Sequence, residues 1–163
     1  MSRLDDVINK LNKSVGAEII QRGTSRLTYS KIPFTSPKLN AMTYGGIARG
    51  KILEICGVEN GGKSTLALAI CGNSQRILQE EFEEKLREYK VQYEELLNGG
   101  KAKEKQAAKL LIEMEEFEEN GPKVVAYLDL ENTLQTDWAE KLGVDIANIL
   151  LIRPENQTGE QIL

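Results

Sequence analysis

The sequence predicts an α/β fold with a mainly parallel sheet, and three observations support this prediction. Segments typical of strands alternate with segments typical of helices along the chain. The strand-like segments are apolar throughout, as strands buried on both faces are. A glycine-rich loop joins the first of them to a helix, which is the order of a phosphate-binding unit. The strand-like segments are Lys51–Cys56, Val124–Leu130 and Ile149–Ile152.

The loop at residues 57–64 reads GVENGGKS and fits the pattern G-x-x-x-x-G-K-[ST] at every position. Its glycines let the backbone wrap closely, so that N–H groups point at phosphate oxygens. The helix that begins near Lys63 adds the positive end of its dipole. We expect Lys63 to reach the β- and γ-phosphates of a nucleoside triphosphate and the Ser64 hydroxyl to coordinate Mg²⁺. The alternative, a glycine-rich turn that binds nothing, is disfavoured by the strand and helix on either side.

Composition excludes several classes of protein. The chain has 163 residues, 40% of them apolar and 28% charged, as in an ordinary globular domain. Apolar runs are far shorter than the ~20 residues of a membrane span, and the polar start is no signal peptide, so we expect a cytoplasmic protein. Two cysteines suggest no disulfide framework. Since there is no histidine, a histidine-based zinc site and a Ser-His-Asp triad are excluded.

The negative charge is unevenly distributed. The net charge is −4, but residues 74–121 hold 8 Lys/Arg against 13 Asp/Glu, while the remainder holds 13 against 12. The acidity therefore belongs to one segment. The overall charge neither supports nor refutes binding to DNA.

The N-terminal region, residues 1–40, is expected to be a segment that precedes the core. Apolar residues at helical spacing predict a helix from Leu4 to Lys13, with Gly16 as its stop. A short strand could follow at residues 17–20, and residues 23–37 have the composition of a connection. This unit is too short to fold alone, so we expect it to pack on the core or on a neighbouring subunit.

Within the expected core, residues 41–163, the segment 74–121 is predicted to form an antiparallel helical hairpin. The helix after the loop continues past Gly72 as far as the turn at residues 98–100. Apolar side chains then recur at steps of three and four in both helices, as in a coiled-coil seam. A solvated spur without a partner and an arm that docks another protein both remain open. The seam residues are Phe82, Leu86, Tyr89, Tyr93 and Leu96, then Ala107, Leu110, Met114 and Phe117.

Further elements follow the hairpin, which residues 120–122 are expected to close. Residues 137–142 are predicted to be helical, with Gly143 as the stop. Thr158 could cap a helix that begins at Gly159.

Three residues beyond the second strand are candidates for chemistry on a nucleotide. Glu131 lies at the carboxyl edge of the sheet, where ligands bind in open α/β folds, and could activate the attacking water. Asp129 could act on magnesium through a water, or could be a buried strand-end residue bonded to backbone; we weigh these equally. Trp138 could stack on a nucleobase, although a lone tryptophan is more often a core or interface residue. An exposed loop acid is the alternative for Glu131.

The segments that carry these motifs closely resemble the RecA family of bacteria and their phages. The resemblance lies in residues 45–59 (GGIARGKILEICGVE), 62–68 (GKSTLAL), 126–131 (AYLDLE), 141–146 (KLGVDI) and 158–161 (TGEQ). It covers residues 4–73 and 122–163. The resemblance implies a RecA-like P-loop ATPase core that binds ATP and Mg²⁺.

The resemblance also implies a function and a set of residues. The function is that of an ATP-dependent DNA recombinase, a single-stranded-DNA-dependent ATPase that forms filaments and exchanges strands with duplex DNA. The N-terminal segment would dock on the adjacent protomer, Glu131 would activate water and Trp138 would contact adenine. Lys63, Ser64 and Thr65 would hold the phosphates and magnesium, beside the metal role already considered for Asp129. The nucleotide-binding positions would be Gly57, Val58, Glu59, Asn60, Gly61, Gly62, Lys63, Ser64, Thr65 and Trp138.

Three departures from the family accompany this resemblance. Asn132 stands where the family usually has histidine, and the hairpin is an insertion. The chain also ends at Leu163, before the Walker B strand and the DNA-binding loops would follow. We therefore expect the N-terminal part of a longer recombinase, with a sheet that is incomplete at its C-terminal side and has an exposed edge. Another RecA-fold ATPase, such as a helicase, and a non-catalytic nucleotide-binding adaptor are the alternatives.

Overall fold

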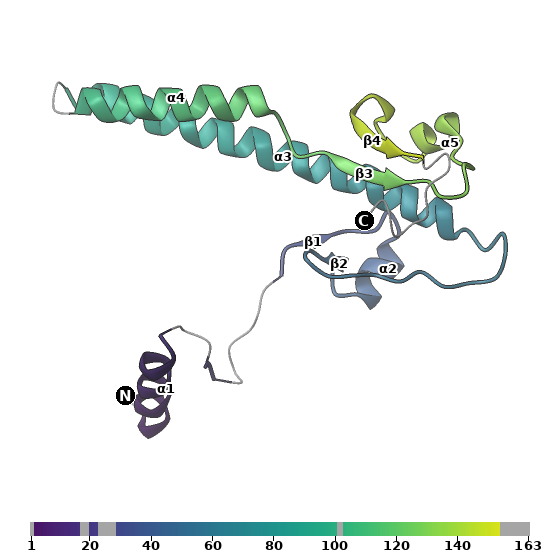
Figure 1. Cartoon of the computed structure of the whole chain (residues 1–163), viewed down its shortest axis with the longest axis horizontal. Coiled ribbons are helices and arrows are strands. Elements are labelled where there is room, and N and C mark those ends of the chain that lie inside the picture. Colours follow the sequence, from purple (N-terminus) through teal and green to yellow (C-terminus); the bar gives the residue numbers. More distant parts are fainter. Residues whose placement is uncertain (1, 17–19, 23–28, 101–102, 154–163) are drawn as a thin grey trace. The chain divides into compact units, whose positions relative to one another are not determined.

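The computed structural model describes residues 2–16, 20–22, 29–100 and 103–153 (Figure 1). The chain divides into two units, residues 1–30 and 31–163. The predicted strand at residues 17–20 and the predicted helix from Gly159 lie largely outside the described residues. Among the described helices none is long and apolar enough to cross a membrane. The domain boundaries expected from the sequence stay predictions.

The first unit contains helix α1, Arg3–Val15, close to the predicted bounds. Ser2 caps its start in a capping box with Asp5, and Gly16 ends it at φ 72°, in the left-handed region that glycine tolerates. The segment after the helix is tied to α1, because the Asn12 side chain exchanges two hydrogen bonds with the backbone of Ile20. The helix buries none of its residues. Its apolar side chains, about half exposed, are Leu4, Val7, Leu11 and Val15.

The second unit begins with three short elements that the sequence did not predict: β1 (Lys31–Ile32), α2 (Pro37–Met42) and β2 (Ile47–Ala48). Strands of two residues are too short for a periodic pattern to reveal. The start of α2 could have been predicted from the sequence, because Ser36 caps the helix and a proline occupies its first turn. β1 and β2 pair antiparallel. Their contact requires glycine at position 46, where a Cβ would lie 2.1 Å from the carbonyl oxygen of Ile32.

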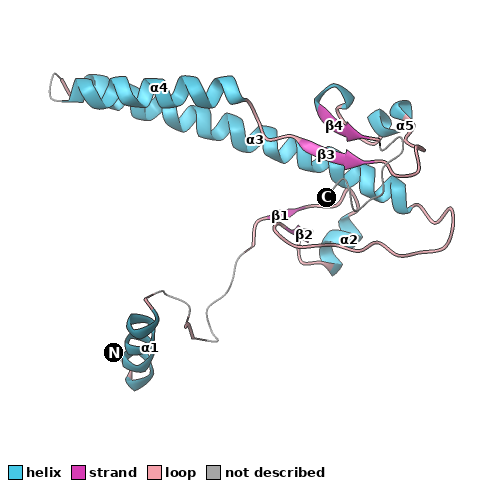
Figure 2. Cartoon of the chain, in the orientation of Figure 1, coloured by secondary structure: helices cyan, strands magenta, loops and turns pink. Residues whose placement is uncertain are grey.

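The parallel sheet consists of β3 (Val125–Leu128) and β4 (Ile149–Ile152), which confirms an α/β fold (Figure 2). Val125 pairs with Ile149 and Leu128 with Ile152, so both strands end at the same edge. The connection contains α5 (Thr136–Lys141) and a 3-10 turn, η2 (Ile146–Asn148). Gly143 ends the helical segment at φ 89°, as its position in the sequence predicted.

Helix α3, Lys63–Asn98, runs without interruption from the glycine-rich loop into the hairpin, and α4, Glu104–Asn120, returns beside it (Figure 1). The predicted hairpin is therefore confirmed, and so is its seam, since every predicted seam side chain is buried or partly buried. Phe117 of α4 stacks on Phe82 of α3 with ring centroids 4.9 Å apart, and Tyr89 lies 5.4 Å from the same ring. Offset aromatic contacts of this kind stabilise a seam beyond simple burial.

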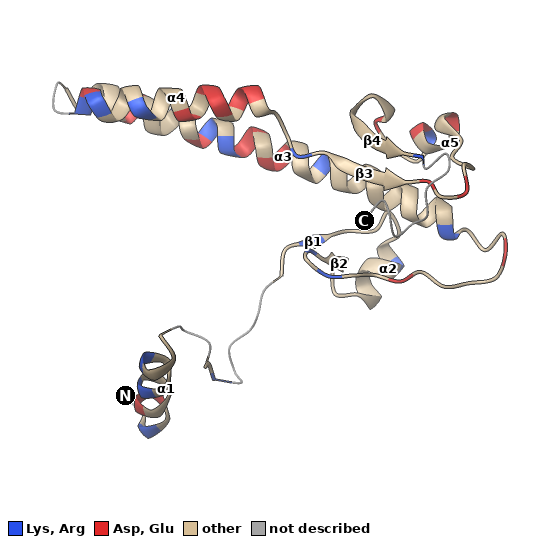
Figure 3. Ribbon diagram, in the orientation of Figure 1, with Lys and Arg blue, Asp and Glu red and all other residues tan. Residues whose placement is uncertain are grey.

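Charge is segregated along the hairpin. Figure 3 shows acidic residues gathered along the ribbon where the hairpin joins the rest of the unit. They come from two short stretches that antiparallel pairing brings to the same level, residues 80–84 of α3 and 113–119 of α4. One of these acids, Glu81, forms an ion pair with Arg49 just after β2. The charge density thus belongs to the hairpin and not to the sheet.

The core lies where the first turns of α3 cross the sheet and α5. Leu68, Ala139 and Val144 are its buried centre. α3 approaches the turn after α5 very closely at Gly72, where a Cβ would lie 2.5 Å from the carbonyl oxygen of Gly143. Gln75, one turn further, donates to the carbonyls of Asp145 and Asn148 at 2.9 and 3.1 Å. Half-buried residues around the centre are Cys71, Tyr127, Leu134, Leu142, Ile146 and Ile149.

The prediction of a buried strand at Lys51–Cys56 is wrong for this structure. The segment has no strand assignment, Ile52 is fully exposed and Leu53 is 47% exposed. A strand is stabilised by hydrogen bonds and side-chain contacts with a neighbour, and β3 and β4 pair only with each other among the described strands. Without a pairing partner, the apolar sequence alone does not impose a strand.

Replacing Gly72 with alanine tests the close approach of α3. The added methyl group would collide with backbone of Gly143, which cannot rotate away, so we expect the free energy of unfolding to fall by about 1–3 kcal/mol despite alanine's higher helix propensity. Urea unfolding followed by the fluorescence of Trp138, the only tryptophan, measures the change. Gly57→Ala is the matched control, because its Cβ would meet nothing closer than 3.7 Å. An unchanged midpoint for Gly72→Ala contradicts the packing argument.

Candidate functional site

The predicted phosphate-binding loop leads directly into the N-terminus of α3. Gly62 is the cap residue at φ 82°, and Asn60 also lies in the left-handed region at φ 57°. The first intrahelical bond runs from the N–H of Leu66 to the carbonyl oxygen of Gly62 at 2.9 Å. The N–H groups of Lys63, Ser64 and Thr65 precede this bond and are therefore available to a ligand. The dipole of a 36-residue helix makes this end attractive to an anion.

Lys63 folds back onto its own loop. Its Nζ donates to the carbonyl oxygens of Gly57 and Val58 at 3.2 and 2.8 Å. The N–H of Gly61 donates to Val58 at 3.1 Å, so this group points into the loop. In this conformation, the helix end presents donors for phosphate, whereas Lys63 and Gly61 would have to release internal bonds to contribute.

A small pocket of about 90 Å³ joins the start of α3 to the region after β3. Ser64 and Thr65 of α3 and Trp138 of α5 are among its lining residues. Trp138 is 45% exposed. The structure thus brings together three residues that the sequence predicted to bind nucleotide, although Trp138 lies more than 70 positions beyond Ser64 and Thr65 in the chain. The remaining lining residues, which the sequence did not single out, are Leu68, Tyr127, Thr133, Leu134 and Gln135.

Asp129 follows β3 and is buried, with only 4% of its surface exposed. Its carboxylate accepts the N–H groups of Thr133 and Leu134 at 3.2 and 3.0 Å, and Arg153 Nε lies 3.4 Å from Oδ2. Burial raises the pKa of this carboxyl group, but the two backbone hydrogen bonds and Arg153 outweigh it, so the pKa lies below its ordinary value. The two alternatives for Asp129 were a buried strand-end residue bonded to backbone and a residue that acts on magnesium through a water. This geometry favours the first.

Glu131 is exposed in the turn that follows Asp129. The turn is closed by the N–H of Asn132, which donates to the carbonyl oxygen of Asp129 at 3.4 Å. Asn132 has φ 52°, a left-handed conformation that asparagine tolerates better than most residues. Nearby, burial raises the pKa of Tyr127, and the charges of Asp129, Cys71 and Glu131 raise it further. Tyr127 therefore stays a neutral hydroxyl at physiological pH.

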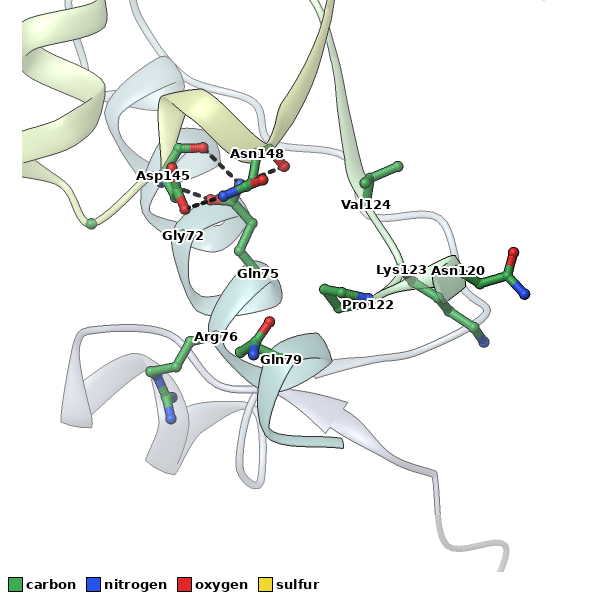
Figure 4. Close-up of a pocket in the computed structure, with 11 residues that line it drawn as sticks. Gly72, Gln75, Arg76, Gln79, Asn120, Pro122, Lys123, Val124, Asp145 and Asn148 are labelled. Carbon is green, nitrogen blue, oxygen red and sulfur yellow. Dashed lines mark hydrogen bonds between the residues drawn. The ribbon is translucent and has the colours of Figure 1, made fainter. Parts of the chain in front are cut away.

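A larger hollow of about 770 Å³ lies at the base of the hairpin (Figure 4). Its polar side chains serve the fold. Gln75 is bonded to the turn around Asp145, while Arg76 forms an ion pair with Glu80 at 2.7 Å. Arg76 and Lys123 point away from each other across the hollow (Figure 4). None of the sequence-predicted site residues lines it.

The residues present fit a magnesium–nucleotide complex at the helix end. The free N–H groups of the first turn suit a phosphate, the Ser64 hydroxyl is exposed beside them, and Trp138 offers an aromatic face across the small pocket. Among the described residues no cluster of three or more acidic or sulfur side chains could hold a metal alone. A metal would therefore depend on phosphate oxygens as well as Ser64.

Comparison with known proteins shows what the chain is similar to. The family model described as the RecA N-terminal domain matches residues 2–80, which contain the loop and the start of α3. The chain is similar to the RecA family over almost its whole length. Protein RecA of Symbiobacterium thermophilum is 30% identical over 98% of this chain and 34% of its own length. Protein RecA of Heliobacterium modesticaldum is 29% identical over 100% of this chain and 35% of its own length. Protein RecA of Thermus aquaticus is 29% identical over 98% of this chain and 34% of its own length.

The chain spans about a third of the length of the curated RecA relatives it matches. Their similarity extends across both β3 and β4, since almost the whole chain is covered. The residues of the site region that sequence reasoning missed are Tyr127, Leu134 and Arg153. Tyr127 and Leu134 read as ordinary strand and loop apolar residues, and Arg153 lies 24 positions from the carboxylate it meets, so no local pattern links the two.

Replacing Asp129 with asparagine is expected to make the stability of the protein less dependent on pH. Because the folded-state pKa is lowered, the carboxylate stabilises the fold fully above its ordinary pKa of about 3.9 and loses this effect as the pH falls through the folded value. We expect Asp129→Asn to cost about 1–3 kcal/mol at pH 7 and much less near pH 3. Urea unfolding across this range measures the difference. Glu140→Gln, an exposed acid of α5, is the control; a cost for Asp129→Asn that stays constant with pH contradicts the assignment.

Proposed function

We propose that this chain forms the ATP-binding part of a RecA-type DNA recombinase with a P-loop core. In this proposal, binding of ATP and Mg²⁺ at the start of α3 supports a single-stranded-DNA-dependent ATPase, filament formation and strand exchange with duplex DNA. The observation that carries the proposal is the small pocket that Ser64 and Thr65 line together with Trp138. The family relationship to RecA proteins supports the recombination role.

Each residue has a defined task in this proposal. The N–H groups at the start of α3 bind phosphate oxygens, and Lys63 leaves the carbonyls of Gly57 and Val58 to neutralise the β- and γ-phosphates. The Ser64 hydroxyl orients Mg²⁺, which supplies electrostatic stabilisation of the phosphates. Trp138 contacts the base. Glu131, exposed at the carboxyl edge of the sheet, accepts the proton of the attacking water.

Helix α1 is proposed to mediate self-assembly. Its apolar side chains at positions 4, 7, 11 and 15 form one stripe and stay about half exposed within the first unit. An amphipathic helix that buries none of its residues gains stability by docking on another surface. In a filament, that surface would belong to the adjacent protomer. The acidic hairpin is a second exposed element, and its partner would be another protein.

A non-catalytic nucleotide-binding adaptor is the second candidate, because the hairpin extends away from the predicted site and has its own apolar seam (Figure 1). Stimulation of ATP hydrolysis by single-stranded DNA separates the two functions. A recombinase shows this stimulation. An adaptor binds ATP without it.

Replacing Lys63 with alanine is expected to abolish measurable binding of Mg²⁺–ATP, because the ammonium group compensates the phosphate charge. Isothermal titration with ATPγS in the presence of Mg²⁺ measures the affinity. Lys38→Ala removes an exposed lysine of α2 and is the matched control. Lys63 also bonds the loop internally, so urea unfolding must show that the variant remains folded. An unchanged affinity in a folded Lys63→Ala protein would refute nucleotide binding at this loop.

Replacing Glu131 with glutamine separates binding from turnover. The glutamine keeps the size of the side chain but cannot accept a proton, so we expect ATP affinity to change less than about twofold and kcat to fall by about 10²- to 10⁴-fold. A coupled ATPase assay, with and without single-stranded DNA, provides the rates in a form of the protein that turns ATP over. Glu140→Gln is the control for loss of a nearby exposed acid. Full activity of Glu131→Gln contradicts its role as the base.

A further inference from the structure

Parallel pairing of β3 with β4 places Asp129 and Arg153 side by side. The last pair of the ladder joins Leu128 to Ile152, and the N–H of Asp129 donates to the carbonyl oxygen of Ile152 at 2.9 Å. Each of the two charged residues is therefore the first position beyond its strand. The sheet register fixes their separation before any side-chain contact is made.

The Asp129 carboxylate ties the following loop to the sheet. It receives the N–H groups of Thr133 and Leu134, while its own carbonyl oxygen receives that of Asn132. Arg153 completes the arrangement: its Nε lies 3.4 Å from Asp129 Oδ2, and its Nη2 donates to the carbonyl oxygen of Leu134 at 3.4 Å. The backbone of the loop is thus held at both ends, and Glu131 lies between them.

The same loop forms one wall of the small pocket. Leu134 packs against the core cluster and lines the pocket together with Gln135 and Trp138. A shift of the loop would therefore move two features at once, the carboxylate of Glu131 and the surface that faces Ser64 and Thr65.

We propose that Asp129 and Arg153 are a pair of positioning residues that hold the 130–135 loop, so that Glu131 and Trp138 are correctly placed relative to the start of α3. This inference rests on the proposed function. In it Asp129 acts through the loop and not as a metal ligand, since both of its oxygens already receive backbone N–H groups. Displacement of a reacting group by about 1 Å can cost 10²-fold in rate, so the pair affects turnover more than nucleotide affinity.

Four variants test the pair: Arg153→Gln, Arg153→Lys, Asp129→Asn and the double variant Asp129→Asn/Arg153→Gln. Arg153→Gln is the mildest, because the arginine side chain is 42% exposed and its removal leaves both backbone bonds to Asp129. Arg153→Lys keeps the charge but loses the forked geometry that reaches Leu134. Arg76→Gln is the matched control, since this arginine pairs with Glu80 in α3.

The first measurement is acrylamide quenching of Trp138 without nucleotide. We expect greater quenching for Arg153→Gln and Asp129→Asn, an intermediate value for Arg153→Lys, and no change for Arg76→Gln. Quenching in the double variant should equal that in Arg153→Gln or Asp129→Asn, because the effects of mutating two residues that act as one unit are not additive. If Arg153→Gln and Asp129→Asn are both quenched to the same extent as the unaltered chain, the proposal that the pair positions the loop is refuted.

The second measurement compares ATP turnover with the affinity for Mg²⁺–ATPγS. We expect turnover to fall about 10- to 100-fold and the dissociation constant to change less than about twofold, a split that general destabilisation would not produce. Equal losses of affinity and turnover overturn the positioning role. An unaltered chain that neither binds nor hydrolyses ATP overturns the proposed function and the catalytic role of the pair, whereas the quenching series independently reports whether the pair holds the loop.

Discussion

At Gly72 the backbone of α3 lies so close to the backbone of Gly143 that a side chain has no space. This approach lets Leu68, one turn earlier, reach Ala139 and Val144 in the centre of the core, and lets Gln75, one turn later, bond to Asp145. Three successive turns of one helix thereby fix the α5 region. Since the same helix begins at the predicted phosphate-binding loop, its docking also sets where Ser64 and Thr65 lie relative to Trp138.

Sequence reasoning succeeded where structure depends on neighbours along the chain. The seam of the hairpin follows from a local repeat, and the stop signals at Gly16 and Gly143 follow from local conformation. It failed at residues 51–56, whose apolar character is typical of a strand but whose conformation depends on a partner distant in sequence. It also missed β1 and β2, whose pairing depends on the absence of a side chain at Gly46.

The candidate site shows the same division. The motif predicted Lys63 and Ser64, the family resemblance added Thr65, and position at the strand end predicted Asp129 and Glu131. Sequence could not distinguish a metal-related Asp129 from a structural one, because both roles place a carboxylate at a strand end. The choice depends on Arg153 and on the loop N–H groups, which only the sheet register brings within reach. For the same reason the contribution of Tyr127 to the pocket wall had no sequence signal.

The length of α3 lets an acidic arm and the predicted phosphate-binding loop share one helix. Glu80, the first acid of the hairpin, lies 17 residues beyond Lys63, or about 25 Å along the axis. This exceeds the Debye length of about 8 Å at physiological salt, so the acids barely oppose phosphate binding. Antiparallel pairing also returns the chain to α3 at Asn120, beside the point where the acids begin (Figure 3). The chain therefore enters β3 close to the point where it left for the hairpin. The aromatic contacts around Phe117 help to offset the conformational entropy that the hairpin residues lose on folding.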